Sequence, residues 1–290
     1  MDPVNGNRDS NRMRRPAGPG GTPGTALLEV TGAACAAVSR TAEDTGDGRQ
    51  AGAQGIFSGV SFSLHAGEVM DLTGPSGSGK SSLLTCIAQL NPRAWATLRL
   101  EGRDSSTFSF QEWRHLVAYL PQKSLLPGDT VADAIRLPYT FAASRRATAP
   151  TDDDIRVALD AVGLGDIELG RDPHDLSGGQ SARVSMLRTM LTHPKVVLAD
   201  EVDAGLDDDS SAIVARYMVR MAHQSGMAMI RVRHRPPDGL ADVKAVLSGG
   251  TLTVEGGAHT PASGFPTGVV GGAADADDAP ETPRFSEEGA

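Results

Sequence analysis

One glycine-rich segment constrains the fold of this chain more than any other feature. Residues 74–81 read GPSGSGKS, which fits the pattern G-x-x-x-x-G-K-[ST]. An apolar stretch at residues 69–73 precedes this segment, and residues 80–90 after it have a helical pattern. A glycine-rich loop between a strand and a helix predicts a phosphate-binding loop, and therefore a nucleotide site.

The residue types of this loop suit the binding of a triphosphate. Glycines let backbone N–H groups converge on phosphate oxygens, and the following helix adds the positive end of its dipole. The Lys80 ammonium can reach the β- and γ-phosphates, and the Ser81 hydroxyl can bind Mg²⁺. The predicted ligands of ATP in this segment are Gly74, Pro75, Ser76, Gly77, Ser78, Gly79, Lys80, Ser81 and Ser82.

A second candidate element is a largely apolar strand, residues 195–200, whose end carries two adjacent carboxylates, Asp200 and Glu201. Asp200 at its carboxyl end can hold Mg²⁺ through water, and Glu201 can polarise the attacking water. An acidic turn after a strand is common by itself. Downstream of a phosphate-binding loop, it predicts the hydrolysis of a nucleoside triphosphate.

The remaining sequence alternates between strand and helix patterns. Strands are predicted at residues 26–30, 60–64, 69–73, 195–200 and 228–232, helices at about 80–90, 130–136, 152–162 and 180–192, and a loop at 32–54. This alternation predicts a mainly parallel sheet with helices on its faces. No internal repeat is visible, so the sequence predicts one nucleotide-binding unit.

The pentapeptide LSGGQ at residues 176–180 precedes the acidic strand and begins a predicted helix. Together with the phosphate-binding loop and the acidic strand, it makes the sequence resemble the ABC ATPase family, whose signature is this pentapeptide. The resemblance covers roughly residues 27–255. It implies an α/β P-loop NTPase fold with a mainly parallel core sheet, an antiparallel β subdomain and a helical subdomain at about residues 128–185.

The resemblance also implies roles for residues outside the three motifs. Gln122 matches the glutamine that contacts Mg²⁺ and the attacking water, in a loop that senses a membrane permease. Residues 205–207 match the loop that crosses a dimer interface, and His234 matches the histidine that contacts the γ-phosphate. The implied catalytic residues are Lys80, Gln122, Glu201 and His234, the implied metal ligands are Ser81, Gln122 and Asp200, and Gln122, Asp200 and His234 also contact the nucleotide.

The implied assembly is a head-to-tail dimer of this subunit, or a pair formed with a related ATPase subunit. ATP lies on the phosphate-binding loop of one subunit, and the signature of the other completes the γ-phosphate cage in trans. ATP binding then closes the dimer and hydrolysis lets it open. The implied ligands in trans are Ser177, Gly178, Gly179 and Gln180.

Composition bears on the partners and the compartment. Hydrophobic residues make up 39% of the 290 residues, and no stretch approaches the ~20 apolar residues of a membrane span. Cys35 and Cys86 are predicted to be buried thiols in a reducing cytosol, and the net charge of -9 argues against nucleic-acid binding. The predicted location is cytoplasmic, on the inner face of the cell membrane through the permease.

Both ends of the chain differ in composition from its middle. Residues 1–25 are rich in Gly, Pro, Arg and Asn, and residues 256–290 are rich in Gly, Ala, Pro and Asp, with no hydrophobic period in either. Such segments cannot bury enough apolar surface to fold. The sequence therefore predicts a disordered N-terminal tail at 1–25, an ABC ATPase domain at 26–255 and a disordered acidic C-terminal tail at 256–290.

The loop after the catalytic carboxylate departs from the family pattern. Val202 and Asp203 stand where most members have Pro followed by Thr or Ser, and Arg235 replaces the Asp that usually follows the histidine. Because Glu201 is retained, hydrolysis is still expected.

The usual aromatic contact to adenine is also missing. No Tyr, Trp or Phe lies between residues 32 and 56, and Phe57 is predicted to belong to the core. The sequence leaves two alternatives, a weak contact to adenine or a contact supplied by Arg49.

Residues 122–134, QKSLLPGDTVADA, are similar to the compact ATP-binding subunits of iron-export type. We therefore predict an ATP-hydrolysing ABC transporter subunit that energises a separate permease, with iron or another metal as one substrate class and amino-acid, phosphate or lipid systems as others. A soluble ABC ATPase acting on nucleic acid or ribosomes fits less well, because the chain has one cassette and no sustained heptads. A regulatory nucleotide-binding subunit is disfavoured by the retained catalytic residues.

Overall fold

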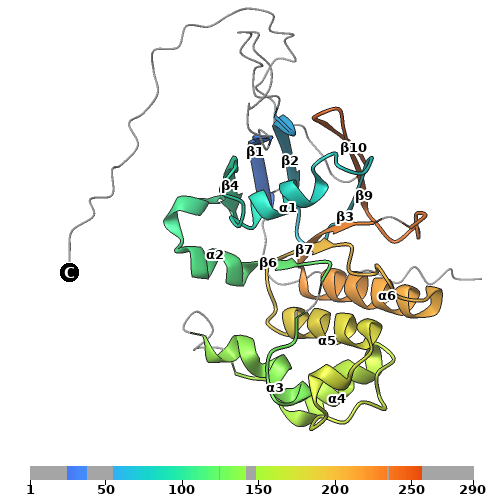
Figure 1. The fold of residues 1–290 in the computed structure, drawn as a ribbon. Helices are drawn as coiled ribbons and strands as arrows, with labels where there is room; N and C mark the ends of the chain where they lie inside the picture. Colours follow the sequence, from blue (N-terminus) through green and yellow to red (C-terminus); the bar gives the residue numbers. More distant parts are fainter. Residues whose placement is uncertain (1–24, 38–54, 124, 142–147, 234, 257–290) are drawn as a thin grey trace, which may run out of the picture. The chain divides into compact units, whose positions relative to one another are not determined.

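Two β-sheets organise the part of the chain that the computed structural model describes, residues 25–37, 55–123, 125–141, 148–233 and 235–256 (Figure 1). All of these residues belong to one structural unit, residues 1–259. The larger sheet contains, in spatial order, β10 (Thr251–Gly256), β9 (Val243–Ser248), β3 (Val69–Thr73), β8 (Ala228–Val232), β7 (Val196–Asp200) and β6 (Val117–Leu120).

The strand directions confirm the predicted mainly parallel core sheet and antiparallel β subdomain. In the larger sheet, β9, β3, β8, β7 and β6 are mutually parallel, and β10 pairs antiparallel with β9. The smaller sheet is antiparallel and contains β2 (Phe57–Leu64), β1 (Leu28–Cys35), β4 (Ala94–Leu100) and β5 (Arg103–Asp104). The carboxyl ends of the parallel strands therefore meet at one edge, where α/β proteins bind their ligands.

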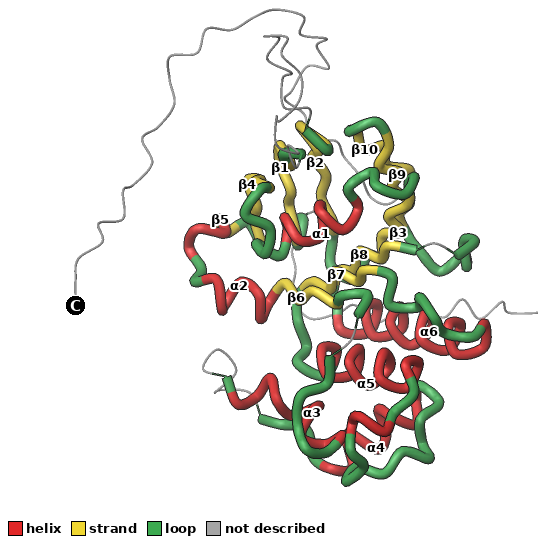
Figure 2. Tube along the Cα trace, in the orientation of Figure 1, coloured by secondary structure: helices red, strands yellow, loops and turns green. Residues whose placement is uncertain are grey.

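Helices cover both faces of the larger sheet (Figure 2). The α-helices are α1 (Lys80–Ile87), α2 (Phe110–Leu116), α3 (Val131–Arg136), α4 (Asp152–Ala161), α5 (Gly178–Met190) and α6 (Asp208–Ser225), and short 3₁₀ helices are η1 (Ser105–Thr107), η2 (Leu137–Thr140) and η4 (Pro173–Asp175). None of the described helices is both long enough and apolar enough to cross a membrane.

Strand β7 separates two hydrophobic cores because its side chains alternate between them. Val196 and Leu198 join the core shared with α1 and the smaller sheet. Val197 and Ala199 join the core shared with α3, α4, α5 and α6. A strand that is buried on both faces has a nearly continuous apolar sequence, and the four apolar residues before Asp200 made this strand recognisable in the sequence.

Strand β1 is longer than the sequence predicts. Residues 32–54 were expected to form a loop after a strand at 26–30, but the strand continues to Cys35. The register against β2 shifts between Val30 and Ala33, where Gly32 has φ +63°. A bulge carried by this glycine lets the strand continue, so the expectation of a loop from residue 32 was wrong.

Two expectations about single residues are confirmed. Phe57 lies in the core and is 2% exposed, so its ring is not available to a ligand at the surface. Cys35 and Cys86 are both buried free thiols. Burial raises the pKa of Cys86 to about 11, and the neighbouring Cys35 adds to this shift, so the Cys86 thiol stays protonated.

Candidate functional site

The glycine-rich loop joins β3 to α1 at the carboxyl edge of the larger sheet. Its first glycine, Gly74, has φ +145°, and a Cβ there would lie 2.1 Å from the backbone oxygen of Leu247. No side chain fits this approach, so glycine is required. Further along, Pro75, Ser76 and Gly77 are exposed, which leaves that part of the loop open to a ligand.

Lys80 is folded into this loop. Its ammonium donates hydrogen bonds to the backbone oxygens of Gly74 at 2.9 Å and Pro75 at 3.0 Å, and the residue is 6% exposed. The Ser78 hydroxyl is also buried and has no hydrogen-bond partner among the described residues. A buried polar atom without a partner is costly, and a phosphate oxygen in the loop would satisfy it.

Asp200 connects the loop to two neighbouring elements. It is 5% exposed at the end of β7. Its Oδ1 accepts a hydrogen bond of 3.0 Å from the Ser81 hydroxyl, and its Oδ2 accepts one of 2.9 Å from the Tyr119 hydroxyl of β6. A hydroxyl and a carboxylate this close to the loop form a donor set that suits Mg²⁺.

Tyr119, three residues before Gln122, was not predicted as a site residue. Burial raises the pKa of the Tyr119 hydroxyl, and the hydrogen bond to Asp200 raises it further. The hydroxyl therefore remains a neutral donor, and it orients one oxygen of Asp200. The signal available in the sequence was a polar group within an otherwise apolar strand, next to the glutamine segment.

Glu201 faces Gln122 across the strand ends. The Gln122 Nε2 donates a hydrogen bond of 2.8 Å to Glu201 Oε2. The backbone of Glu201 is left-handed with φ +51°, a conformation that residues other than glycine seldom adopt and that is concentrated at functional sites. The structure thus brings Gln122, Glu201, Asp200 and Ser81 to the same edge of the sheet.

The signature pentapeptide forms the start of α5. The Ser177 Oγ accepts a hydrogen bond of 3.2 Å from the Gln180 backbone N–H, and Gln180 Oε1 accepts one of 2.9 Å from the Ser177 N–H, which is a capping box. Gly178 is exposed, with open space where a Cβ would be. A Cβ on Gly179 would lie 3.2 Å from Leu206 of the loop after β7, so the two segments are neighbours.

Three predicted contacts stay predictions. Ser82 lies in the first turn of α1, one residue after Ser81, and is partly buried. His234 and Arg49 lie outside the described residues, so the contact to the γ-phosphate and the contact to the base stay predictions.

Sequence comparison relates this chain to ATP-binding subunits of transporters. A family model described as ABC transporter matches residues 57–204. The chain is 35% identical over 187 residues to the probable iron export ATP-binding protein FetA of Escherichia coli, covering 64% of this chain and 81% of that protein. It is 33% identical over 190 residues to the lipoprotein-releasing system ATP-binding protein LolD 2 of Caulobacter vibrioides, covering 64% of this chain and 82% of that protein.

Structural comparison shows the same fold in a solved protein. A bacterial Atm1-family ABC exporter with ATP bound matches with a TM-score of 0.62 at 22% sequence identity. The match covers 82% of this chain and 40% of the exporter chain.

Proposed function

Since this chain belongs to the ABC transporter family, we propose that it is a Mg²⁺-dependent ATPase subunit that works as a head-to-tail dimer and energises a separate membrane permease. ATP binding and hydrolysis are the activity of the family's ATP-binding subunits. The observation that carries the proposal is the meeting of Ser81, Asp200, Gln122 and Glu201 beside the glycine-rich loop.

Mg²⁺ fits the donors at the end of β7. No group of three or more His, Cys, Asp or Glu forms a metal site among the described residues. Mg²⁺ is usually held by one or two carboxylates together with substrate phosphates, which matches Asp200, the Ser81 hydroxyl and the triphosphate. Bound Mg²⁺ would neutralise the charge that develops on the phosphates.

Glu201 and Gln122 would position the water that attacks the γ-phosphate. Glu201 would accept a hydrogen bond from the attacking water and orient it toward the γ-phosphate. The Gln122 amide donates a hydrogen bond of 2.8 Å to the Glu201 carboxylate, so it lies within reach of a water that this carboxylate would bind. Lys80 would exchange its two backbone oxygens for phosphate oxygens of the nucleotide.

We expect Tyr119→Phe to weaken ATP binding roughly tenfold in the presence of Mg²⁺ and to leave binding in EDTA unchanged, because Asp200 loses one charge-assisted hydrogen bond. Calorimetric titration of ATP under both conditions measures the difference. Tyr139→Phe is the matched control, since the Tyr139 hydroxyl donates to the backbone oxygen of Leu191 instead. An equal loss with and without Mg²⁺ would contradict the role of Tyr119.

The signature supports a dimer that is completed in trans. The cap of α5 leaves the helix N-terminus exposed at Gly178, where backbone N–H groups and the helix dipole favour an anion. The hydrogen bonds of the Ser177 and Gln180 side chains join those two residues to each other. We therefore assign the γ-phosphate of ATP bound to a second copy of the chain as the ligand of this helix end.

We expect Gly178→Asp to reduce ATP-dependent dimerisation at least tenfold without loss of stability. A Cβ at residue 178 would meet nothing within 4 Å in one copy, and an acidic residue in the first turn stabilises a helix. In the dimer, the same carboxylate would face, and repel, the γ-phosphate of the ATP bound to the partner. Light scattering with ATP measures dimerisation, and Gly170→Asp, at another open position, is the control. A dimer that forms equally well in both variants would refute the trans assignment.

A groove beside the site supports docking of a permease segment. Its volume is about 550 Å³, and its lining includes Leu90, Arg114, Phe141 and Tyr119. Leu90 is 44% exposed and Phe141 57% exposed, so apolar surface is available to a partner. Because Tyr119 lines the groove and also binds Asp200, a partner in the groove would contact the nucleotide site through one side chain.

We propose metal ions as the first class of transported substrate to test. The relative in Escherichia coli is named a probable iron export ATP-binding protein, and this supports metal export as the first substrate class to test. The other relative is named for lipoprotein release. Selection of the cargo would belong to the permease residues that contact it.

A further inference from the structure

Three arginines alternate along the end of strand β8 and the segment after it. Arg231 lies in the strand, Arg233 follows it, and Arg235 comes two residues later. The neighbouring Ile230 and Val232 face the core shared with α1, so Arg231 points toward the opposite face of the strand. The side chains of Arg231 and Arg233 are only 5% and 8% exposed.

Each arginine meets carboxylates from other elements. Arg231 pairs with Asp71, its direct neighbour in β3, at 2.7 Å, and with Asp238 at 3.3 Å. Arg233 also pairs with Asp238. Buried charges persist only when they are paired, so these groups hold one another in place.

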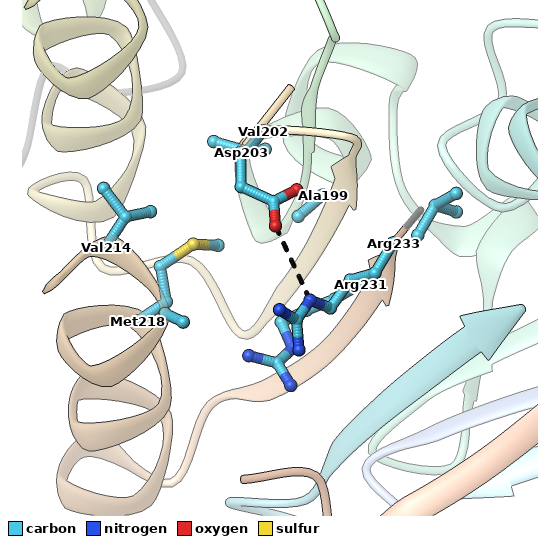
Figure 3. Close-up of a pocket in the computed structure, with 9 residues that line it drawn as sticks. Ala199, Val202, Asp203, Val214, Met218, Arg231 and Arg233 are labelled. Atoms are coloured by element: carbon cyan, nitrogen blue, oxygen red, sulfur yellow. Dashed lines mark ion pairs between the residues drawn. The ribbon is translucent and has the colours of Figure 1, made fainter. Parts of the chain in front are cut away.

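Asp203 joins this network to the candidate site. It lies two residues after Glu201, in the loop between β7 and α6. Its Oδ2 accepts a hydrogen bond of 3.3 Å from the Ser211 hydroxyl of α6 and lies 3.6 Å from Arg233 Nε (Figure 3). The same oxygen lies 3.8 Å from Arg235 Nε. A single carboxylate oxygen thus links the loop, α6 and the arginine segment.

Arg235 holds the other end of the same loop. Its guanidinium donates hydrogen bonds to the backbone oxygen of Leu206 and to the Asp208 carboxylate. With the contact to Asp203, it spans residues 203–208. Its side chain is 31% exposed, so it is the most accessible of the three arginines.

The loop at residues 203–208 follows Glu201, whose backbone conformation is left-handed. Glu201 has φ +51°, its N–H donates to the Val232 oxygen at 3.2 Å, and its oxygen accepts from the Ala204 N–H at 2.9 Å. A left-handed conformation at a residue other than glycine persists only where its surroundings hold it. These surroundings are the turn that contains Asp203 and the strand that leads to Arg233.

A cavity next to the network is too small for a substrate. It is lined by Asp203, Arg231, Arg233, Val214 and Met218, among others, and has a volume of about 20 Å³ (Figure 3). Sites for small molecules are more than tenfold larger, roughly 300–1,000 Å³. The charges here therefore face one another and hold the loop instead of a ligand.

We propose that Asp203 and Arg235 are positioning residues that clamp the loop at residues 203–208 and thereby hold Glu201 in its reactive orientation. The proposal rests on the role of Glu201 given above. Neither residue needs to touch the nucleotide. Substitution of either Asp203 or Arg235 should slow ATP hydrolysis and leave the affinity for ATP unchanged.

The test compares full-length Asp203→Asn, Arg235→Gln, Arg235→Lys and the double variant Asp203→Asn/Arg235→Gln with the wild type. We expect kcat to fall roughly 10- to 100-fold in either charge-removing single variant, because a small misplacement of a catalytic group costs this much. The ATP dissociation constant should change less than about twofold, which is far below the tenfold change that one lost charge-assisted hydrogen bond causes. The double variant should be no slower than the slower single variant, and Arg235→Lys should recover part of the rate.

A matched control and a second readout separate positioning from folding. Asp153→Asn removes one partner of the exposed Asp153–Arg156 pair of α4, at 3.1 Å, and should leave kcat unchanged. Hydrogen exchange of residues 201–208 without nucleotide should increase in both charge-removing single variants and no further in the double variant. This readout does not depend on hydrolysis.

Three outcomes would overturn the proposal. The first is an unchanged kcat in folded Asp203→Asn and Arg235→Gln, and the second is effects that multiply in the double variant. The third is a parallel loss of ATP affinity and kcat, which would indicate general damage to the site. A wild-type chain that binds ATP without hydrolysing it would contradict the proposed function, whereas the exchange data would still decide whether the two residues clamp the loop.

Discussion

Lys80→Ala is expected to weaken ATP binding roughly 10- to 100-fold, because a charge-assisted hydrogen bond to phosphate is worth about 1.5–3 kcal/mol. In the structure, the ammonium donates hydrogen bonds to the backbone oxygens of Gly74 and Pro75. The variant therefore loses both the phosphate contact and a contact that shapes the loop. Calorimetric titration with ATP measures the affinity, and a thermal melt measures the stability.

Two further variants isolate the role of the charge at residue 80. Lys80→Met keeps most of the buried side-chain volume and should bind ATP as weakly as the alanine variant. Lys195→Ala removes an exposed lysine that pairs with Glu101 at 3.0 Å and should bind ATP normally. Unchanged nucleotide affinity in folded Lys80→Met would refute the assignment of the phosphate-binding loop.

Glu201→Gln is expected to reduce kcat by about 10²- to 10⁴-fold, the usual contribution of a positioned general base. ATP affinity should be retained, because the amide oxygen of glutamine can still accept the hydrogen bond that Gln122 Nε2 donates. The substitution thus removes the charge and keeps the contact. Steady-state phosphate release measures kcat, and a trapped ATP-bound dimer should accumulate.

The control for this substitution is an exposed glutamate away from the loop. Glu168→Gln lies in the connection between α4 and α5 and should hydrolyse ATP at the wild-type rate. Wild-type turnover by Glu201→Gln would remove Glu201 from the catalytic role. The clamp proposed for Asp203 and Arg235 would then have no catalytic residue to position.

The central elements of the fold could be predicted from local sequence. The loop at residues 74–81 combines glycines, a lysine and a serine in a fixed order between a strand and a helix. The apolar run before Asp200 is continuous because β7 is buried on both faces. Features of this kind depend only on neighbouring residues, so the sheet edge and its candidate ligands were recognisable.

Contacts between distant strands could not be predicted. Asp71 and Arg231 each interrupt an apolar strand, and opposite charges at such positions are a signal of buried pairing. Their partnership depends on the register of β3 against β8, which sets them side by side. Tyr119 likewise becomes a partner of Asp200 only because β6 lies beside β7.

The bulge in β1 and the predicted contacts between two copies of the chain are two further features that local sequence does not determine. The sequence around Gly32 predicts a loop, but a glycine with positive φ can also continue a strand through a bulge. The predicted partner of the signature is a second copy of the chain. No local pattern in one copy can supply that geometry.

The decisive experiment for the transporter role is isolation of the full-length Glu201→Gln chain with Mg²⁺ and ATP from detergent-solubilised native membranes. We expect recovery of one multi-spanning membrane protein, and its loss when Phe141→Glu is added in the groove while ATP binding persists. Recovery of ribosomes or nucleic acid, with no membrane protein, would contradict the transporter role and favour a soluble ABC ATPase.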